Sequence, residues 1–136
     1  MRLKKAVANL ILWERVSRVG TAGRAGVPHV VPVCHILREG KIYFGSGRDG
    51  RKVLNLKGNP RVAVTVDLYA DDWSNLKGVM VQGTARLIER GPRFRTIRAF
   101  LYKKYPQYPD QAALDQSDSV IVELTPTRVF AWGLKS

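Results

Sequence analysis

The sequence is poor in cysteine, in long apolar runs and in acidic residues. Cys34 is the one cysteine in 136 residues, which excludes a disulfide within the chain and predicts a reducing compartment, the cytoplasm. No apolar run approaches the ~20 residues of a membrane span, so no membrane partner is expected. The chain has 23 Lys and Arg but only 11 Asp and Glu. The resulting net charge of +12 favours binding to nucleic acid, anionic lipid or a phosphorylated small molecule.

The length and composition predict a single domain over residues 1–136. With 45% hydrophobic and 25% charged residues, the chain can bury a core without disulfides or metal. Residues 1–13 resemble a secretion signal, but Glu14 and Arg15 follow directly and no small-residue cleavage site appears. The apolar spacing in this segment instead predicts an amphipathic helix, formed by Leu3, Ala6, Val7, Leu10 and Ile11.

The remaining pattern is rich in strands. Short helices are predicted over 51–57 and 92–104, and strands over 16–21, 28–37, 41–44, 61–68, 79–89, 119–124 and 128–132. Pro32 predicts an edge position or a bulge within the second strand. Six or seven strands joined mostly by tight turns indicate a mainly β (α+β) protein, an antiparallel barrel with short flanking helices.

A glycine-rich loop between a strand and a helix is the main binding signal. It runs from Gly45 through Ser46, Gly47 and Gly50 and ends on the adjacent cations Arg51 and Lys52. Glycine lets backbone N–H groups approach an anion, a helix N-terminus adds partial positive charge, and arginine offers a bidentate fork. The loop therefore predicts a phosphate site, with a solvated turn as the alternative.

Two other motifs give weaker evidence of a binding site. The spacing of Gly45, Gly47 and Gly50 matches the dinucleotide fingerprint, but the helix over 51–57 is too short to cross a sheet and start a parallel strand. His29, Cys34 and His35 crowd one segment, yet on a strand His29 and His35 would lie roughly 20 Å apart with Cys34 facing the other way, so no metal site is predicted.

The aromatic residues divide into two groups. Trp13 and Phe44 are expected in the core, because they flank or interrupt apolar segments. Trp73 lies in a polar turn and Trp132 lies near the C-terminus, so each is expected to be covered by a ligand or by a second subunit.

Five segments in order give the chain a resemblance to a known superfamily. They are Gly26–Cys34, Ile42–Phe44, the loop ending at Arg51 and Lys52, Asn59–Val64, and Asp71–Ser74 followed by Val79–Ala85. Together they resemble the pyridoxamine 5'-phosphate oxidase-like, FMN-binding split-barrel superfamily. Including Lys104–Tyr108, the pattern is most similar to its small members described as probable deazaflavin-dependent enzymes.

The resemblance implies a homodimer of split β-barrels with two flavin sites at the subunit interface. Arg51 and Lys52 would hold the cofactor phosphate, with Gly45 and Ser46 beside them. The strand bearing Val31, Pro32, Val33 and Cys34 would lie along the flavin ring. Trp73 and Trp132 would lie near the ring or the interface.

Two departures bear on the substrate. Where the oxidases carry an arginine on that strand, this chain has Val31, and where they have a glutamine before the Val-Met-Val run, it has Gly78. Their C-terminal substrate-binding segment also has no counterpart, so pyridoxamine 5'-phosphate is not the expected substrate.

The sequence therefore predicts an FMN-binding oxidoreductase that transfers hydride or electrons to an unknown small molecule. One alternative keeps the fold but uses the 8-hydroxy-5-deazaflavin coenzyme F-420, whose anionic tail would suit Lys57, Arg61 and Lys77. Another is a non-catalytic module that stores flavin, or that binds nucleic acid through the basic helix over 92–104, although nucleic acid is not the expected partner.

Overall fold

The computed structural model describes residues 1–135. Its helices are α1 (Lys5–Trp13), α2 (Arg51–Gly58), α3 (Pro92–Lys104) and α4 (Tyr108–Ala112), with a 3-10 turn η1 (Trp73–Asn75). Its strands are β1 (Ser17–Ala22), β2 (Pro28–Val33), β3 (His35–Arg38), β4 (Lys41–Gly47), β5 (Arg61–Leu68), β6 (Lys77–Ile88) and β7 (Ser119–Trp132).

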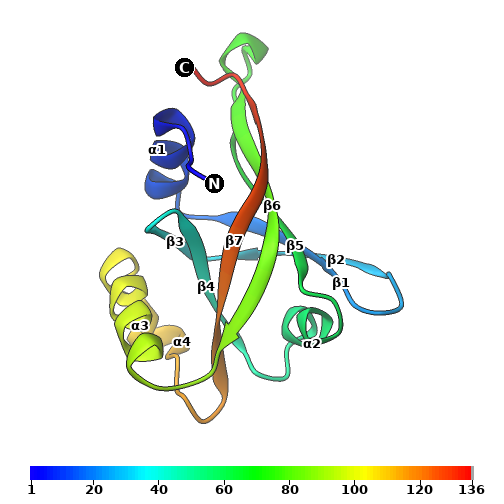
Figure 1. Cartoon of the computed structure of the whole chain (residues 1–136). Helices are drawn as coiled ribbons and strands as arrows, with labels where there is room; N and C mark the ends of the chain where they lie inside the picture. Colours follow the sequence, from blue (N-terminus) through cyan, green and yellow to red (C-terminus); the bar gives the residue numbers. More distant parts are fainter. Residues whose placement is uncertain (136) are drawn as a thin grey trace.

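The seven strands form one antiparallel sheet in the order β2-β1-β5-β6-β7-β4-β3. β2 and β3 are the two edges of this order, yet only Cys34 separates them along the chain. The sheet must therefore curl until its edges approach each other, as Figure 1 shows, with α1 and α3 on one side and α2 at its lower end. This confirms the predicted antiparallel split barrel with short helices.

The predicted strand over 28–37 is divided in two. The chain leaves β1 along β2 and, at Cys34, passes to the other edge of the sheet as β3. Pro32 lies on the edge strand β2, opposite Arg18 of β1, which confirms the expected edge position. Proline has no N–H to donate, so an edge strand tolerates it.

The two strands predicted over 119–124 and 128–132 are a single strand, β7. Proline was expected to end the first of them, but Pro126 stays within β7 opposite Gly83 of β6. The register shifts between Gln82 and Gly83, so Thr127 is the extra residue of a bulge. A Cβ on Gly83 would lie 2.2 Å from the Thr125 carbonyl oxygen, so glycine is needed for the two strands to approach this closely.

Two apolar clusters hold the fold together. One fills the curl of the sheet, where α1 contributes Val7, Leu10 and Ile11. The other lies between the sheet and α3, whose Phe94, Ile97 and Leu101 are at most 1% exposed. Burying each such side chain contributes about 1.5–3 kcal/mol.

Trp13 is not in the core, and this prediction was wrong. Its side chain is 75% exposed, whereas Phe44 is fully buried as expected. The buried stripe of α1 runs through Val7, Leu10 and Ile11. Trp13 comes two residues after Ile11. At about 100° per residue, its side chain is turned by about 200° from Ile11 and faces away from that stripe.

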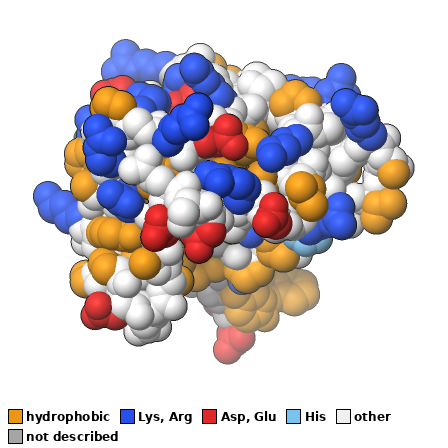
Figure 2. Space-filling view, turned by 90° about the horizontal axis from the view of Figure 1, so that it is seen from below, with side chains coloured by type: hydrophobic (Ala, Val, Ile, Leu, Met, Phe, Trp, Pro, Cys, Tyr) orange, Lys and Arg blue, Asp and Glu red, His pale blue; other side chains and the backbone are white. Residues whose placement is uncertain are grey.

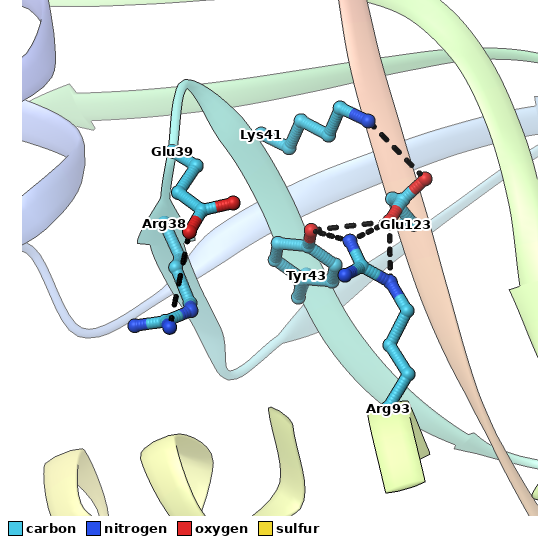
Figure 3. A network of polar contacts seen from close by, with 6 residues as sticks. All are labelled: Arg38, Glu39, Lys41, Tyr43, Arg93 and Glu123. Atoms are coloured by element: carbon cyan, nitrogen blue, oxygen red, sulfur yellow. Dashed lines mark hydrogen bonds and ion pairs between the residues drawn. The ribbon is translucent and has the colours of Figure 1, made fainter. Parts of the chain in front are cut away.

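A buried carboxylate ties α3 to the sheet. Glu123 of β7 is 4% exposed, and its Oε2 accepts hydrogen bonds from the Tyr43 hydroxyl at 3.1 Å and from Arg93 Nε at 3.2 Å (Figure 3). The Nη2 group of Arg93 also contacts this oxygen, and Lys41 Nζ lies 3.6 Å from Oε1. Burial and the Glu123 hydrogen bond raise the pKa of Tyr43 to about 12.

A second polar network joins α1, β3 and α3. His35 is fully buried, and its Nε2 donates to the Ile11 carbonyl at 2.8 Å. Lys104 donates to the carbonyls of Glu14 and His35 at 2.8 and 2.9 Å. Burial and the Lys104 charge lower the pKa of His35 to about 4, so its imidazole is neutral at physiological pH and serves the fold.

Candidate functional site

The predicted phosphate loop is shorter than expected, because Gly45, Ser46 and Gly47 pair with β7 as the end of β4 and only residues 48–50 turn into α2. Gly50 is the N-cap, no side chain caps the helix, and the Gly50 N–H donates to the Gly47 carbonyl at 3.1 Å. Ser46 is buried at the end of β4, and a Cβ on Gly50 would lie only 3.2 Å from its Oγ. The Ser46 hydroxyl and the uncapped first turn of α2 therefore lie together, at an end that favours an anion.

Lys52 is half-buried without an acidic partner. Desolvation lowers the pKa of its ammonium group, and no carboxylate within residues 1–135 lies within ion-pair distance of it. Arg51, its neighbour, is exposed and also makes no ion pair with a described residue. A dianionic phosphate would supply the charge that both side chains lack.

Arg51 also lines a groove between α2 and the turn of the β1–β2 hairpin. The groove has a volume of about 680 Å³. We call it the helix groove; its walls are Gly23, Arg24, Ala25, Val27, Pro28 and His29 from the hairpin, and Arg51, Leu54, Asn55, Lys57 and Gly58 from α2. Figure 2 shows Lys and Arg side chains spread over this end of the molecule, with fewer Asp and Glu among them.

A second, flatter groove of about 510 Å³ crosses the sheet and meets the first at Pro28 and His29. We call it the sheet groove, and it runs over β2, β1, β5, β6 and β7. Small residues form much of its surface, among them Gly20, Ala22, Ala63 and Gly83. A flat surface of small side chains beside Val30, Arg61 and Gln82 suits a planar heterocycle with a polar edge.

His29 lies where the two grooves meet. Its Nδ1 is buried and has no hydrogen-bond partner among residues 1–135. Buried polar atoms are normally paired, and the tautomer of His29 decides whether this nitrogen donates or accepts a hydrogen bond. The grooves, the orphaned nitrogen and the unpaired cations thus fit a phosphorylated planar cofactor.

The strand residues predicted beside the flavin ring lie next to these grooves but do not line them. Val31 and Val33 point inward and pack against the core within the curl. Pro32 is exposed at the sheet edge, and Cys34 is half-buried against the cluster under α3. The β2 residues that line the grooves are Pro28, His29 and Val30.

Gly45 has a structural role on the other side of β4. A Cβ there would lie 2.6 Å from a Leu114 methyl group and 2.8 Å from the Tyr108 hydroxyl. Its missing side chain lets the segment around α4 pack onto β4. Whether Gly45 also contacts a cofactor stays a prediction.

Trp73 and Trp132 lie at the same end of the molecule, far from the phosphate loop. Trp73 is 73% exposed in the turn between β5 and β6, and Trp132 lies against Gly78 at the end of β7. β5 connects that turn with the end of α2 and is eight residues long, about 26 Å. Figure 1 shows the end of β7 and the turn between β5 and β6 away from α2, so within one chain the two tryptophans cannot contact a phosphate held by Arg51 and Lys52.

Sequence reasoning missed Arg24 and considered His29 only as a metal ligand. Neither residue lies near α2 in the sequence, and their meeting depends on how the hairpin folds onto the helix. One signal was available: Asn55 is a polar residue on the inner face of α2, and it donates to Thr21 of β1 at 3.0 Å. Of the other cations considered for an anionic tail, Arg61 lines the sheet groove, while Lys77 lies opposite Leu68 at the far end of β5.

The described part of the chain has neither a metal-binding cluster nor a helix that could span a membrane. No three His, Cys, Asp or Glu side chains among residues 1–135 gather closely enough to hold a metal ion. No helix in that range has the length and apolar character required to cross a bilayer.

Solved structures share this fold at low sequence identity. The heme storage protein HutZ of Vibrio cholerae aligns with a TM-score of 0.80 over 96% of this chain and 94% of its own, at 18% identity. A FAD-binding protein of Mesorhizobium loti gives 0.78 over 95% and 94%, at 22% identity. An F420 reductase gives 0.75 over 94% and 98%, at 20% identity.

The sequence itself carries the family assignment. No curated protein matches the chain. The family model for pyridoxamine 5'-phosphate oxidase matches residues 3–133, nearly the whole length, and the curled antiparallel sheet agrees with it. The chain is therefore a member of the pyridoxamine 5'-phosphate oxidase family.

Proposed function

We propose that the protein binds FMN and acts as an oxidoreductase on a small molecule. The observation that carries this proposal is the half-buried, unpaired Lys52 beside Arg51 at the uncapped start of α2. Such a cation is costly in an empty site and becomes favourable once an anion binds. The phosphate would contact Arg51, Lys52 and the Ser46 hydroxyl, and the ring would lie on the sheet groove.

Bound flavin would supply the redox chemistry by accepting and donating hydride or electrons. The chain's own residues would bind and orient it. The small side chains of the sheet groove leave one face of a planar ring free for a substrate, and Val30 and Arg61 limit where the ring can slide. No acid or base of this chain needs to take part in the transfer itself.

A deazaflavin coenzyme is the second candidate. It is favoured by the cations of the helix groove, which extend beyond what one phosphate requires. The shared fold of an F420 reductase is compatible with it. Both cofactors would use the same phosphate loop.

We further propose a homodimer, because a second subunit would bury the exposed aromatic side chains. Tyr69, Trp73 and Trp132 are 71%, 73% and 43% exposed and lie at the end of β5 away from α2. A two-fold arrangement would bring the tryptophans of one copy toward the grooves of the other. The ring would then lie at the interface.

The Arg51→Ala/Lys52→Ala variant tests the proposal. We expect the affinity for FMN, measured by equilibrium titration of flavin fluorescence, to fall roughly tenfold or more, since two charge-assisted contacts are lost. Circular dichroism should show an unchanged fold, because neither side chain belongs to the core.

The matched control is Arg95→Ala/Lys103→Ala, which removes the same charge from exposed positions of α3. Equal loss of affinity in both variants would mean that only net charge matters. Wild-type affinity in the Arg51/Lys52 variant would refute the phosphate assignment.

A further inference from the structure

A third groove, of about 350 Å³, lies at the edge strand β3, on the other side of the sheet from α2. Figure 1 shows β3 between α1 and α3, and all three elements line this groove. We call it the edge groove; its apolar walls are Leu12 of α1, Ile36 and Leu37 of β3, and Phe100 of α3. It shares no residue with the helix groove or the sheet groove, so a ligand bound there would occupy a site of its own.

The main chain of β3 offers a free hydrogen-bond donor to the edge groove. In an antiparallel pair, successive residues direct their N–H and C=O alternately toward and away from the partner strand. The His35 N–H donates to the Tyr105 hydroxyl at 3.0 Å and the His35 carbonyl accepts from Lys104 at 2.9 Å, so His35 faces away from β4. Leu37, two residues later, faces the same way, and no residue within 1–135 pairs with its main chain on that side.

Three cations share the groove with this donor. They are Arg38, Lys103 and Lys104, and no described Asp or Glu lines the groove beside them. The Arg38 guanidinium lies 3.9 Å from the Glu39 carboxylate and 4.1 Å from the centre of the Phe100 ring, so it covers one apolar wall. Lys103 makes no ion pair with any residue in the described range. The edge groove therefore combines apolar walls with an excess of positive charge.

Lys104 is the most deeply placed of these cations. Two of its three N–H groups donate to the carbonyls of Glu14 and His35, which leaves one donor. Burial and the charge of Arg15 lower the pKa of Lys104 to about 8, and the opposing effects of Cys34 and Glu14 only partly offset them. A negative charge bound nearby would stabilise this ammonium group.

The dimensions of the groove limit the size of a ligand. Phe100 and Lys104 are four residues apart on α3, which is about 6 Å along the helix. Leu12 and Phe100 are 47% and 37% exposed, whereas Ile36 is buried. A volume of 350 Å³ lies at the lower end of the range for small-molecule sites. This suits a compact, flat body of one or two rings and not a long chain.

Each polar group of the groove also has a simpler role. Lys103 lies in the last turn of α3, where a cation interacts favourably with the helix dipole, and Lys104 ties α1 to β3. Water can accept from the Leu37 N–H, as it does on other edge strands. None of these roles removes Leu12 and Phe100 from water or balances the charge of the groove. A single ligand with an anionic end and an apolar body would do both.

We propose that the edge groove binds a small aromatic carboxylate. Its ring would lie against Leu12 and Phe100. Its carboxylate would accept from the Leu37 N–H and pair with the three cations of the groove. This inference does not depend on the proposed flavin site, because the two sites lie on different elements and share no residue.

Calorimetric titration with 2-naphthoate and the uncharged 2-naphthamide tests the proposal. We expect wild-type protein to bind the carboxylate at least roughly tenfold more tightly than the amide. In Arg38→Gln/Lys103→Gln, the carboxylate should lose roughly tenfold in affinity, while the amide changes by less than about twofold. In NMR spectra of nitrogen-15-labelled protein, 2-naphthoate should move the Leu37 amide proton downfield, as a new hydrogen bond to an anion does.

The matched control is Arg86→Gln/Arg95→Gln, which removes the same charge from exposed positions outside the groove. Equal losses in both double variants, equal affinity for the two probes, or no binding at about 1 mM would each overturn the proposal. So would an unchanged Leu37 amide signal in the saturated protein.

A competition titration separates this inference from the proposed function. Excess FMN should leave the affinity for 2-naphthoate within about twofold, whether or not FMN binds. If FMN displaces 2-naphthoate, the probe occupies the flavin site and this inference fails. If the protein binds 2-naphthoate as described but no flavin, the proposed function fails and this inference stands.

Discussion

At the scale of single residues, Glu123 shows how a buried charge can be kept. Burial favours the neutral acid, but hydrogen bonds from Arg93 and Tyr43 and the charge of Lys41 outweigh it, so the pKa of Glu123 lies below its usual value. Because the pKa in the folded protein is lower than in the unfolded chain, this group stabilises the fold above the ordinary glutamate pKa. The contribution is lost as pH falls through the folded value.

Replacing Arg93 should reverse the direction of this shift. In Arg93→Met, burial becomes the dominant influence and raises the pKa of Glu123, so the charged carboxylate would cost free energy at neutral pH. We expect the free energy of unfolding at pH 7 to fall by about 1–3 kcal/mol, and acid unfolding to begin at higher pH. Urea titrations followed by circular dichroism at several pH values measure both effects.

Arg95→Met provides the comparison, since Arg95 lies on the same helix, is exposed and makes no ion pair with a described residue. Its effect should stay within about 0.5 kcal/mol at every pH. A pH profile of Arg93→Met parallel to that of wild type would show that Arg93 does not control the ionisation of Glu123.

Single residues were predicted from sequence with mixed success. Phe44 is buried as expected, because its neighbours in sequence already define a strand. Trp13 was misplaced because it lies two residues beyond Ile11, the last buried position of α1, and therefore points away from the buried stripe. The partners of Glu123 come from β4 and α3, and no local pattern connects them.

At the scale of elements, glycine decides how closely β6 and β7 approach. Gly83→Ala would place a methyl group against the Thr125 backbone, which cannot move without breaking the bulge beside Pro126. We expect a loss of about 1–3 kcal/mol in the free energy of unfolding, as for other overpacked sites. Denaturant titration measures it.

Gly47→Ala is the matched control, because a Cβ at this position meets nothing within 4 Å. Its backbone does not need a positive φ either, so the stability should change by less than about 0.5 kcal/mol. Equal losses in the two variants would indicate a general cost of replacing glycine in strands and not a specific contact at Gly83.

Most elements follow from the sequence because each has a local cause. Helix α2 ends at Gly58, one residue later than predicted and directly before Asn59 and Pro60, and α3 starts at Pro92 as predicted. The alternating valines of β5 gave its bounds correctly. β7 was predicted as two strands because the bulge beside Pro126 depends on the partner strand β6 and has no local sequence pattern.

At the scale of the whole molecule, the exposed aromatic residues predict the oligomeric state. We expect the protein to sediment at twice its chain mass of 15.3 kDa. The Trp73→Ser/Trp132→Ser variant should weaken association roughly tenfold or more, because large aromatic residues dominate the energy of interfaces. Sedimentation velocity over a range of concentrations measures this.

Trp13→Ser is the control, since this indole is just as exposed, at 75%, but lies on α1. It should leave the assembly unchanged. If Trp13→Ser dissociates the protein and the double variant does not, the interface lies on the α1 side instead. A monomeric wild-type protein would contradict the homodimer itself.

The phosphate loop could be found from the sequence because it is contiguous, whereas the grooves could not. The helix groove joins a hairpin turn to α2, about 30 residues further along the chain. The sheet groove needs the strand order, in which β1 pairs with β5. Resemblance to a family supplied the overall fold, but only the spatial arrangement revealed Arg24 and His29.

The single residue between β2 and β3 also affects whether copies of the chain can exchange edge strands. Exchange of strands between molecules usually starts from a free edge strand at a chain end. Here β2 follows β1, β3 precedes β4, and only Cys34 separates the two edge strands along the chain. An edge strand can therefore leave only if Cys34 moves with it and disturbs the opposite edge, which disfavours strand exchange between copies of the chain.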